Sequence, residues 1–217
     1  MFDSKLRPII DPPLNAMGRA LARLGIEANQ MSLLGAAVGL LAGLIIGLGH
    51  PLMGLALILG NRMIDGLDGA VARAAGPSDF GGYLDIICDF VFYVAVPLGF
   101  GFARPENLPY AMVLIASFTL TGVSFLAYAA LAEKRGLQTQ AHGHKSFFYS
   151  TGIAEGGETI LAFVLMCLWP AAFPLIAGTY AGLCGLTVVQ RSLIARREFS
   201  APVVAREVPL GNVPDPG

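Results

Sequence analysis

The chain is dominated by apolar runs of about 20 residues, the length that an α-helix needs to cross the hydrocarbon core of a bilayer. Only 13% of its 217 residues are charged and the mean hydropathy is +0.65, whereas a soluble domain carries about 25% charged residues. The sequence therefore predicts an all-α, polytopic membrane protein. Between glycine, proline and charged residues we count six transmembrane helices, at residues 30–49, 52–75, 79–102, 108–132, 149–169 and 172–195.

The two ends of the chain differ from these runs. Residues 1–28 are not apolar enough to span, but their pattern predicts an amphipathic helix that lies on the membrane surface. The residues that carry this pattern are Leu14, Met17, Leu21 and Leu24 on the apolar side, with Arg19 and Arg23. The last segment has four prolines after Glu198 and no helical period, so we expect a disordered cytoplasmic tail at 197–217. Residues 29–196 form the expected six-helix domain.

Basic residues indicate the orientation. Six spans put both termini on one side of the membrane, together with twelve lysines and arginines, while the other side holds only Arg104 and one further arginine, Arg62, falls within a span. Because lysine and arginine are enriched in cytoplasmic loops, we expect both termini in the cytoplasm. The predicted location is the cell (inner) membrane.

Four aspartates interrupt the second and third runs at helical spacing. Asp65 and Asp68 are three residues apart and Asp85 and Asp89 four apart, so each pair lies on one face of its helix. A Gly-Pro-Ser turn around Pro77 joins the two helices. Asp68 lies nine residues before Pro77 and Asp85 eight after it, while Asp65 and Asp89 each lie twelve away. At about 1.5 Å per residue, an antiparallel hairpin brings all four carboxylates to one place.

These acids need a partner, because a charge at the bilayer centre costs roughly 2.5–3.5 kcal/mol even on gentle insertion scales. Two divalent cations supply it, and ligands that are all oxygen favour Mg²⁺ or Mn²⁺ over zinc. The three cysteines show no CxxC spacing, which argues against a zinc site or a disulfide framework. Two such ions can hold the attacking and leaving oxygens of a phosphoryl displacement. A divalent-cation or proton transporter that uses the same acids is the alternative.

The residues around the aspartates fit a phosphate ligand. Gly69 follows Asp68 and Gly81 lies one turn before Asp85, and the missing side chains let a phosphate or nucleotide approach the backbone. Arg73 can bind a phosphate through its planar guanidinium. Arg62, one turn before Asp65, either touches a diphosphate or pairs with a carboxylate.

The pattern D-xx-DG-xx-AR followed by G-xxx-D-xxx-D resembles the signature of the CDP-alcohol phosphotransferase (CDP-alcohol phosphatidyltransferase) family. The matching residues are Asp65, Asp68, Gly69, Ala72, Arg73, Gly81, Asp85 and Asp89. Glu27–Gly35 also looks like the family's entry to its first span, and the resemblance covers about residues 15–195. One departure is a turn of seven residues between Arg73 and Gly81, where eight are expected. It shortens the cytoplasmic loop and leaves the spacing within each helix intact.

The resemblance implies transfer of a phosphatidyl group from CDP-diacylglycerol to a small alcohol, with release of CMP. It makes Asp65, Asp68 and Asp85 ligands of two metal ions and Asp89 both a ligand and the general base. It assigns contacts with the CDP moiety to four residues, Gly69, Ala72, Arg73 and Gly81. A homodimer is expected from the family alone, and no nucleic-acid partner is expected. Transport does not require the Gly69, Ala72 and Arg73 cluster.

The acceptor alcohol is left open by the sequence. Glycerol 3-phosphate, inositol 1-phosphate, serine and inositol all fit. Lys145, Arg135 and Arg191 lie at the cytoplasmic ends of the last three spans. They either set the topology or form a basic pocket for a phosphorylated acceptor, and they favour glycerol 3-phosphate or another phosphorylated alcohol weakly.

Overall fold

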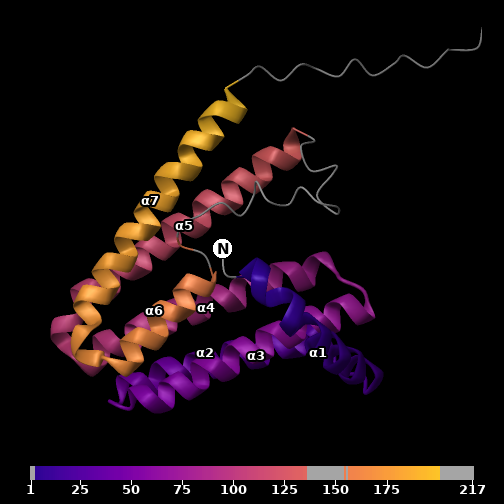
Figure 1. Cartoon of the computed structure of the whole chain (residues 1–217), viewed down its shortest axis with the longest axis horizontal. Helices are drawn as coiled ribbons and strands as arrows, with labels where there is room; N and C mark the ends of the chain where they lie inside the picture. Colours follow the sequence, from indigo (N-terminus) through magenta and orange to yellow (C-terminus); the bar gives the residue numbers. More distant parts are fainter. Residues whose placement is uncertain (1–2, 136–153, 155, 201–217) are drawn as a thin grey trace, which may run out of the picture.

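The computed structural model describes residues 3–135, 154 and 156–200, and every regular element in them is helical (Figure 1). The all-α prediction is therefore confirmed for the described part of the chain. The α-helices are α1 Asp3–Arg23, α2 Ala28–Gly47, α3 Pro51–Ala75, α4 Asp79–Ala103, α5 Leu108–Lys134, α6 Gly156–Leu168 and α7 Phe173–Phe199. Two short 3₁₀ turns, η1 Pro105–Asn107 and η3 Pro170–Ala172, lead into α5 and α7.

Four helices in the described residues are long and apolar enough to cross a membrane, judged by length and composition. They are α2, α4, α5 with η1, and α7 with η3. Helix α3 is as long as α4, but it carries four charged residues, Arg62, Asp65, Asp68 and Arg73, whereas α4 carries three aspartates. Helix α6 is apolar and spans 13 described residues. The predicted count of six spans is therefore not confirmed, whereas a multi-pass arrangement is.

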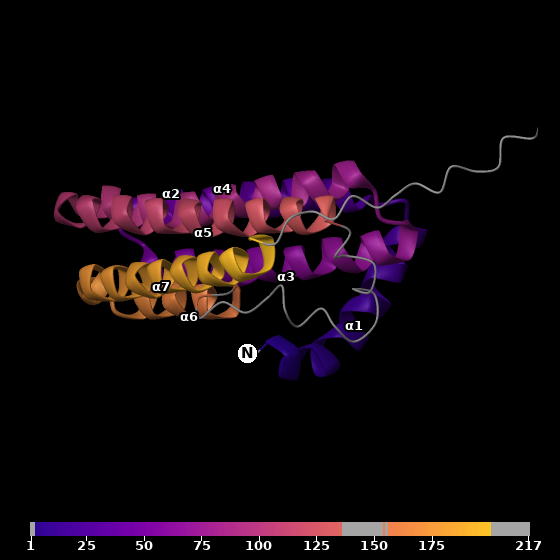
Figure 2. The same cartoon turned by 90° about the horizontal axis from the view of Figure 1, so that it is seen from above.

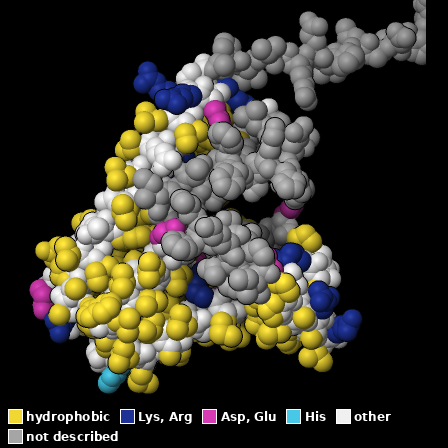
Figure 3. Space-filling view, in the orientation of Figure 1, with side chains coloured by type: hydrophobic (Ala, Val, Ile, Leu, Met, Phe, Trp, Pro, Cys, Tyr) yellow, Lys and Arg dark blue, Asp and Glu magenta, His cyan; other side chains and the backbone are white. Residues whose placement is uncertain are grey.

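The surface supports this assignment. Leucines of α2 such as Leu40 and Leu44 are 55% and 59% exposed, and apolar side chains cover much of the face in Figure 3. Such broad apolar exposure is unusual on a soluble monomer and is typical of a surface that faces lipid.

The turn between α3 and α4 forms as the sequence predicts. Gly76 ends α3 with φ 103°, a conformation that residues with a Cβ rarely adopt. Ser78 then caps α4, because its Oγ accepts a hydrogen bond of 3.0 Å from the Gly81 amide. The two caps fix where each helix ends, and so fix how far each aspartate lies from the turn.

Helix α2 packs along both arms of this hairpin. Buried glycines on both helices let α2 and α4 approach closely. A Cβ on Gly43 of α2 would collide with the backbone of Ala95, and a Cβ on Gly99 of α4 would collide with the Gly43 carbonyl. Small residues at such crossings let helix backbones come together in membranes. Gly39, Gly43 and Gly47, which lie four residues apart in α2, thus form a packing surface for α4.

Helix α1 lies against α3, near the end of the hairpin where the turn is (Figures 1 and 2). Gly18 of α1 is buried and sits directly on Ala70 of α3. Leu14 and Leu21 are partly buried, while Met17 is 49% exposed. A helix therefore forms where it was predicted, and its place on the membrane surface stays a prediction.

The second half of the chain joins the hairpin through an aromatic core. Phe92 of α4 meets Phe163 of α6 with ring centroids 5.6 Å apart, and Phe100 of α4 stacks on Phe173 of α7 at 4.8 Å. Helices α5 and α7 pack side by side, as Figure 2 shows. Helix α7 continues to Phe199, three residues into the segment predicted as tail, while residues 201–217 lie outside the described part.

Candidate metal and nucleotide site

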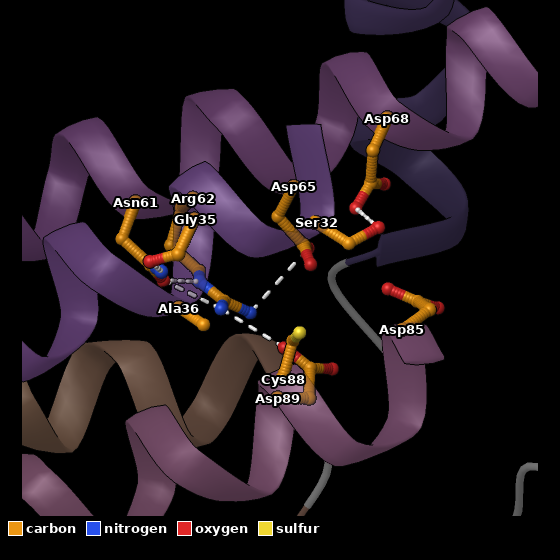
Figure 4. Close-up of a pocket in the computed structure, with 10 residues that line it drawn as sticks. All are labelled: Ser32, Gly35, Ala36, Asn61, Arg62, Asp65, Asp68, Asp85, Cys88 and Asp89. Atoms are coloured by element: carbon orange, nitrogen blue, oxygen red, sulfur yellow. Dashed lines mark hydrogen bonds and ion pairs between the residues drawn. The ribbon is translucent and has the colours of Figure 1, made fainter. Parts of the chain in front are cut away.

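The hairpin brings carboxylates from both of its arms together. One oxygen each from Asp65 and Asp68 of α3 and from Asp85 of α4 lie within 4.8 Å of one another. Figure 4 shows these side chains, with Asp89, around a common space. Three carboxylates at this separation, with no sulfur or nitrogen donor among them, fit a hard divalent cation. The convergence therefore follows the spacing in the sequence.

Ser32 of α2 completes this side of the site. Its hydroxyl donates a hydrogen bond of 2.9 Å to Oδ2 of Asp68, whose side chain is buried. The bond fixes one carboxylate of the cluster from a third helix. Ser32 was missed at the sequence level, although it lies within the segment Glu27–Gly35 that resembles the family's entry.

Asp89 lies beside the three-acid group rather than within it. Its Oδ1 accepts a hydrogen bond of 3.0 Å from Nη2 of Arg62, and Nη1 of the same arginine lies 3.4 Å from Asp65. Of the two roles open for Arg62, the structure shows the pairing with carboxylates. The positive charge partly offsets the repulsion among the four acids.

The guanidinium of Arg62 also contacts Asn61 and Phe92, on the side away from the acids. Nε and Nη2 donate to Oδ1 of Asn61 at 2.8 and 2.6 Å, and the ring of Phe92 lies 4.4 Å below it. The buried Asn61 amide in turn donates to the Gly35 carbonyl of α2 at 2.7 Å. Arg62 is therefore fixed by hydrogen bonds and a cation–π contact that do not involve the acids.

A pocket of about 180 Å³ opens next to the acids, between the start of α2 and the hairpin turn. Three of the four residues predicted to contact CDP line it, Gly69, Ala72 and Gly81, and Asp68 and Asp85 form its border with the acid cluster. A Cβ on Gly81 would lie 3.2 Å from Oδ1 of Asn29 and tighten the pocket. A ligand whose phosphate binds at the acids can thus extend into this pocket.

Arg73, the fourth predicted contact, is exposed in the last turn of α3. Its Nε and Nη2 donate to Oδ1 of Asn15 in α1 at 3.2 and 2.9 Å. Its Nη1 lies 3.3 Å from where a Cβ on Gly69 would be. Helix α1 therefore holds this guanidinium at the edge of the pocket, a contact that sequence spacing did not indicate.

Two of the predicted acceptor residues link helices α5 and α7. Arg135 donates to the backbone carbonyls of Glu198 and Phe199 at 3.0 and 2.6 Å. Arg191 donates to the Thr121 carbonyl at 2.8 Å and to Ser124 at 2.7 Å. The third, Lys145, lies outside the described residues.

Residues 26–190 match the sequence profile of the CDP-alcohol phosphatidyltransferase family. The inner membrane protein YnjF of Escherichia coli K12 is 46% identical over 192 residues, which cover 88% of this chain and 93% of the relative. The archaetidylinositol phosphate synthase of Pyrococcus horikoshii is 32% identical over 203 residues, covering 90% of this chain and 97% of that protein.

Solved structures show the same fold. The phosphatidylinositol phosphate synthase of Mycobacterium tuberculosis with CDP-DAG bound gives a TM-score of 0.63 at 21% identity, covering 84% of this chain and 93% of that one. The same synthase in complex with manganese and citrate gives 0.60 at 22% identity, covering 83% and 87%.

Proposed function

The chain belongs to the CDP-alcohol phosphatidyltransferase family, and we propose that it transfers the phosphatidyl group of CDP-diacylglycerol to a phosphorylated alcohol, releasing CMP. Family membership makes it a transferase of a substituted phosphate group and does not favour the transporter alternative. The observation that carries the proposal is the group of Asp65, Asp68 and Asp85 within 4.8 Å, beside a pocket bordered by Gly69 and Gly81.

We propose that the four aspartates hold two divalent cations, Mg²⁺ or Mn²⁺. The all-oxygen donor set fits such ions, and manganese is present in one structure of the mycobacterial synthase. When bound, the ions stabilise negative charge on the phosphoryl oxygens. Ser32 orients one of the ligands, Asp68, through its hydrogen bond of 2.9 Å.

The residues of the chain have separate tasks in the proposed reaction. Asp89 accepts the proton of the acceptor hydroxyl. The hydroxyl oxygen then bonds to the phosphorus of the phosphatidyl group, and the bond from that phosphorus to the bridging oxygen breaks. CMP leaves with the bonding electron pair. Gly69, Ala72 and Gly81 surround the CMP portion, and Arg73 offers its guanidinium to a phosphate.

The CDP-DAG bound by the mycobacterial synthase supports CDP-diacylglycerol as the donor. For the acceptor, the archaetidylinositol phosphate synthase of P. horikoshii and the phosphatidylinositol phosphate synthase of M. tuberculosis both carry inositol phosphate in their names. We therefore place a phosphorylated inositol ahead of glycerol 3-phosphate. Arg135, Arg191 and Lys145 are the proposed contacts with its phosphate, because guanidinium and ammonium groups bind phosphate oxygens through charge-assisted hydrogen bonds.

The membrane setting supports the same reaction. An E. coli relative named as an inner membrane protein and four apolar helices indicate a multi-pass protein of the inner membrane. We propose that both termini and the turn of the hairpin face the cytoplasm, since twelve basic residues fall on that side. Lipid then surrounds the acyl chains of the donor while the nucleotide stays at the aqueous edge. A homodimer is part of this proposal on family grounds.

The deciding experiment offers the purified full chain labelled CDP-diacylglycerol, with Mg²⁺ or Mn²⁺, and one alcohol at a time. The panel contains inositol 1-phosphate, glycerol 3-phosphate, inositol and serine. We expect CMP release to depend on a phosphorylated alcohol and a labelled lipid product to appear with it. Faster release with inositol or serine than with inositol 1-phosphate or glycerol 3-phosphate overturns the assigned acceptor class. No release with any alcohol overturns the proposed reaction.

A further inference from the structure

Arg62 occupies a position in the acid cluster that a metal ion could otherwise take. Its Nη2 lies 3.0 Å from Oδ1 of Asp89 and its Nη1 lies 3.4 Å from Oδ2 of Asp65. At this level of the hairpin, a divalent ion is expected to bridge one carboxylate from α3 and one from α4. The guanidinium already fills that role with a single charge.

The two levels of the hairpin therefore differ. At the level nearer the turn, Asp68 and Asp85 have no arginine partner among the described residues, and both lie in the group of three with Asp65. At the deeper level, Asp89 is engaged by Arg62 and lies outside that group. An ion that enters nearer the turn meets Asp68 and Asp85, which make no ion pair with Arg62, while an ion at Asp89 meets a guanidinium at hydrogen-bond distance.

Arg62 does not leave this place readily. Two of its donors bind Asn61, which is itself anchored to the Gly35 carbonyl, and its plane rests on the ring of Phe92. These contacts are independent of the acids, so the positive charge stays nearby even after Asp89 turns toward a metal ion. Like charges a few ångströms apart in a poorly solvated site repel strongly.

We propose that Arg62 is a positioning residue that makes the two cation sites unequal, an inference that rests on the proposed metal-dependent function. The first divalent ion binds Asp65, Asp68 and Asp85 tightly. The second binds only when Asp89 exchanges Arg62 for metal, and it binds more weakly. Until then, the hydrogen bond from Nη2 of Arg62 holds the Asp89 side chain beside the cluster.

The test is a titration of the purified full chain with Mn²⁺ alone, without nucleotide or lipid substrate. The electron paramagnetic resonance signal of free Mn²⁺ reports how many ions are bound and how tightly. For the wild type we expect two classes of site. Arg62→Gln removes the charge, and we expect the second ion to bind roughly ten- to a hundredfold more tightly, the range set by loss of a hydrogen bond to a charged group.

Two further variants separate charge from a general effect on folding. Arg62→Lys keeps a positive charge at the same position, and we expect the second ion to bind this variant as weakly as it binds the wild type. Arg23→Gln removes an arginine from the exposed last turn of α1, and both affinities should stay at their wild-type values. Thermal unfolding of each variant without metal shows whether it is folded. If Arg62→Gln is unstable, the wild-type and Arg62→Lys titrations show whether two unequal sites are present whenever position 62 carries a positive charge.

Each outcome bears on a separate claim. Two equal sites in the wild type, or a second site left unchanged by Arg62→Gln, overturns the role of Arg62 and leaves the proposed transfer intact. A second ion that tightens equally in Arg62→Lys and Arg62→Gln also overturns it, since charge would then not be the cause. A protein that binds no Mn²⁺ at all while it releases CMP refutes the metal-dependent function itself.

Discussion

The close crossing of α2 and α4 predicts that a larger residue at Gly99 destabilises the fold. A methyl group on Gly99 would collide with the carbonyl oxygen of Gly43 and would lie 3.0 Å from the Gly43 carbonyl carbon. Both are backbone atoms, so they cannot turn aside as a flexible side chain can. Gly99→Ala must push the two helices apart. Adding one carbon to a well-packed contact costs about 1–3 kcal/mol.

Gly60→Ala is the matched control. Gly60 lies in α3, and a Cβ there meets nothing within 4 Å. Alanine in a helix is up to about 1 kcal/mol more favourable than glycine, and this gain applies to both variants. The difference between them therefore isolates the collision. At about 2–4 °C per kcal/mol for a chain of this size, we expect Gly99→Ala to unfold roughly 2–12 °C below Gly60→Ala.

The cysteines provide the assay. Cys88, Cys167 and Cys184 are all buried and free, so a dye that fluoresces on reaction with thiols reports unfolding in detergent. Because α4 also carries Asp85, the same variant should bind Mn²⁺ less tightly than the control. Equal unfolding temperatures for Gly99→Ala and Gly60→Ala would refute the close approach of the two helices.

Three other substitutions test the site. Asp85→Asn removes a ligand from α4, so we expect Mn²⁺ affinity and CMP release to fall at least about tenfold together, since charged contacts contribute about 1.5–3 kcal/mol; unchanged Mn²⁺ affinity excludes Asp85 as a ligand. Asp89→Asn should slow transfer by about 10²–10⁴-fold while the chain still binds CDP-diacylglycerol, and a loss smaller than tenfold rules out the general base. Asn15→Ala frees Arg73 from α1 and should raise the KM for CDP-diacylglycerol roughly threefold to tenfold; an unaltered KM argues that α1 does not position this arginine.

Much of the site follows from spacing along two helices. The distances of Asp65, Asp68 and Asp85 from the turn set their levels, because the rise per residue of an α-helix is fixed. Gly76 ends α3 through its positive φ, and Ser78 begins α4 through the hydrogen bond that its side chain accepts from a backbone amide. These are short-range effects, so one sequence was sufficient to predict them.

The contacts that the sequence did not reveal come from other helices. Ser32 reaches Asp68 across 36 positions and Asn15 reaches Arg73 across 58. Neither residue belongs to a periodic pattern that distinguishes it from other polar residues at a helix end. Such pairings depend on how α1 and α2 pack against the hairpin, which in turn depends on glycine contacts spread along the chain.

Arg62 shows the limit of spacing most clearly. Its position one turn before Asp65 allowed either a diphosphate contact or an ion pair. The choice is made by Asn61 and Phe92, which hold the guanidinium toward Asp89. The predicted count of six spans also stays unconfirmed, because α3 carries two arginines besides two of the aspartates and α6 has only 13 described residues.

The central claim is that α3 and α4 place their carboxylates around shared cations. Crystals of the full chain soaked with Mn²⁺ test this most directly, because anomalous scattering locates the metal without any assumption about the reaction. We predict a peak about 2.0–2.3 Å from oxygens of Asp65, Asp68 and Asp85. Manganese bound elsewhere, with these three carboxylates unliganded in a protein that still transfers the phosphatidyl group, would contradict the account.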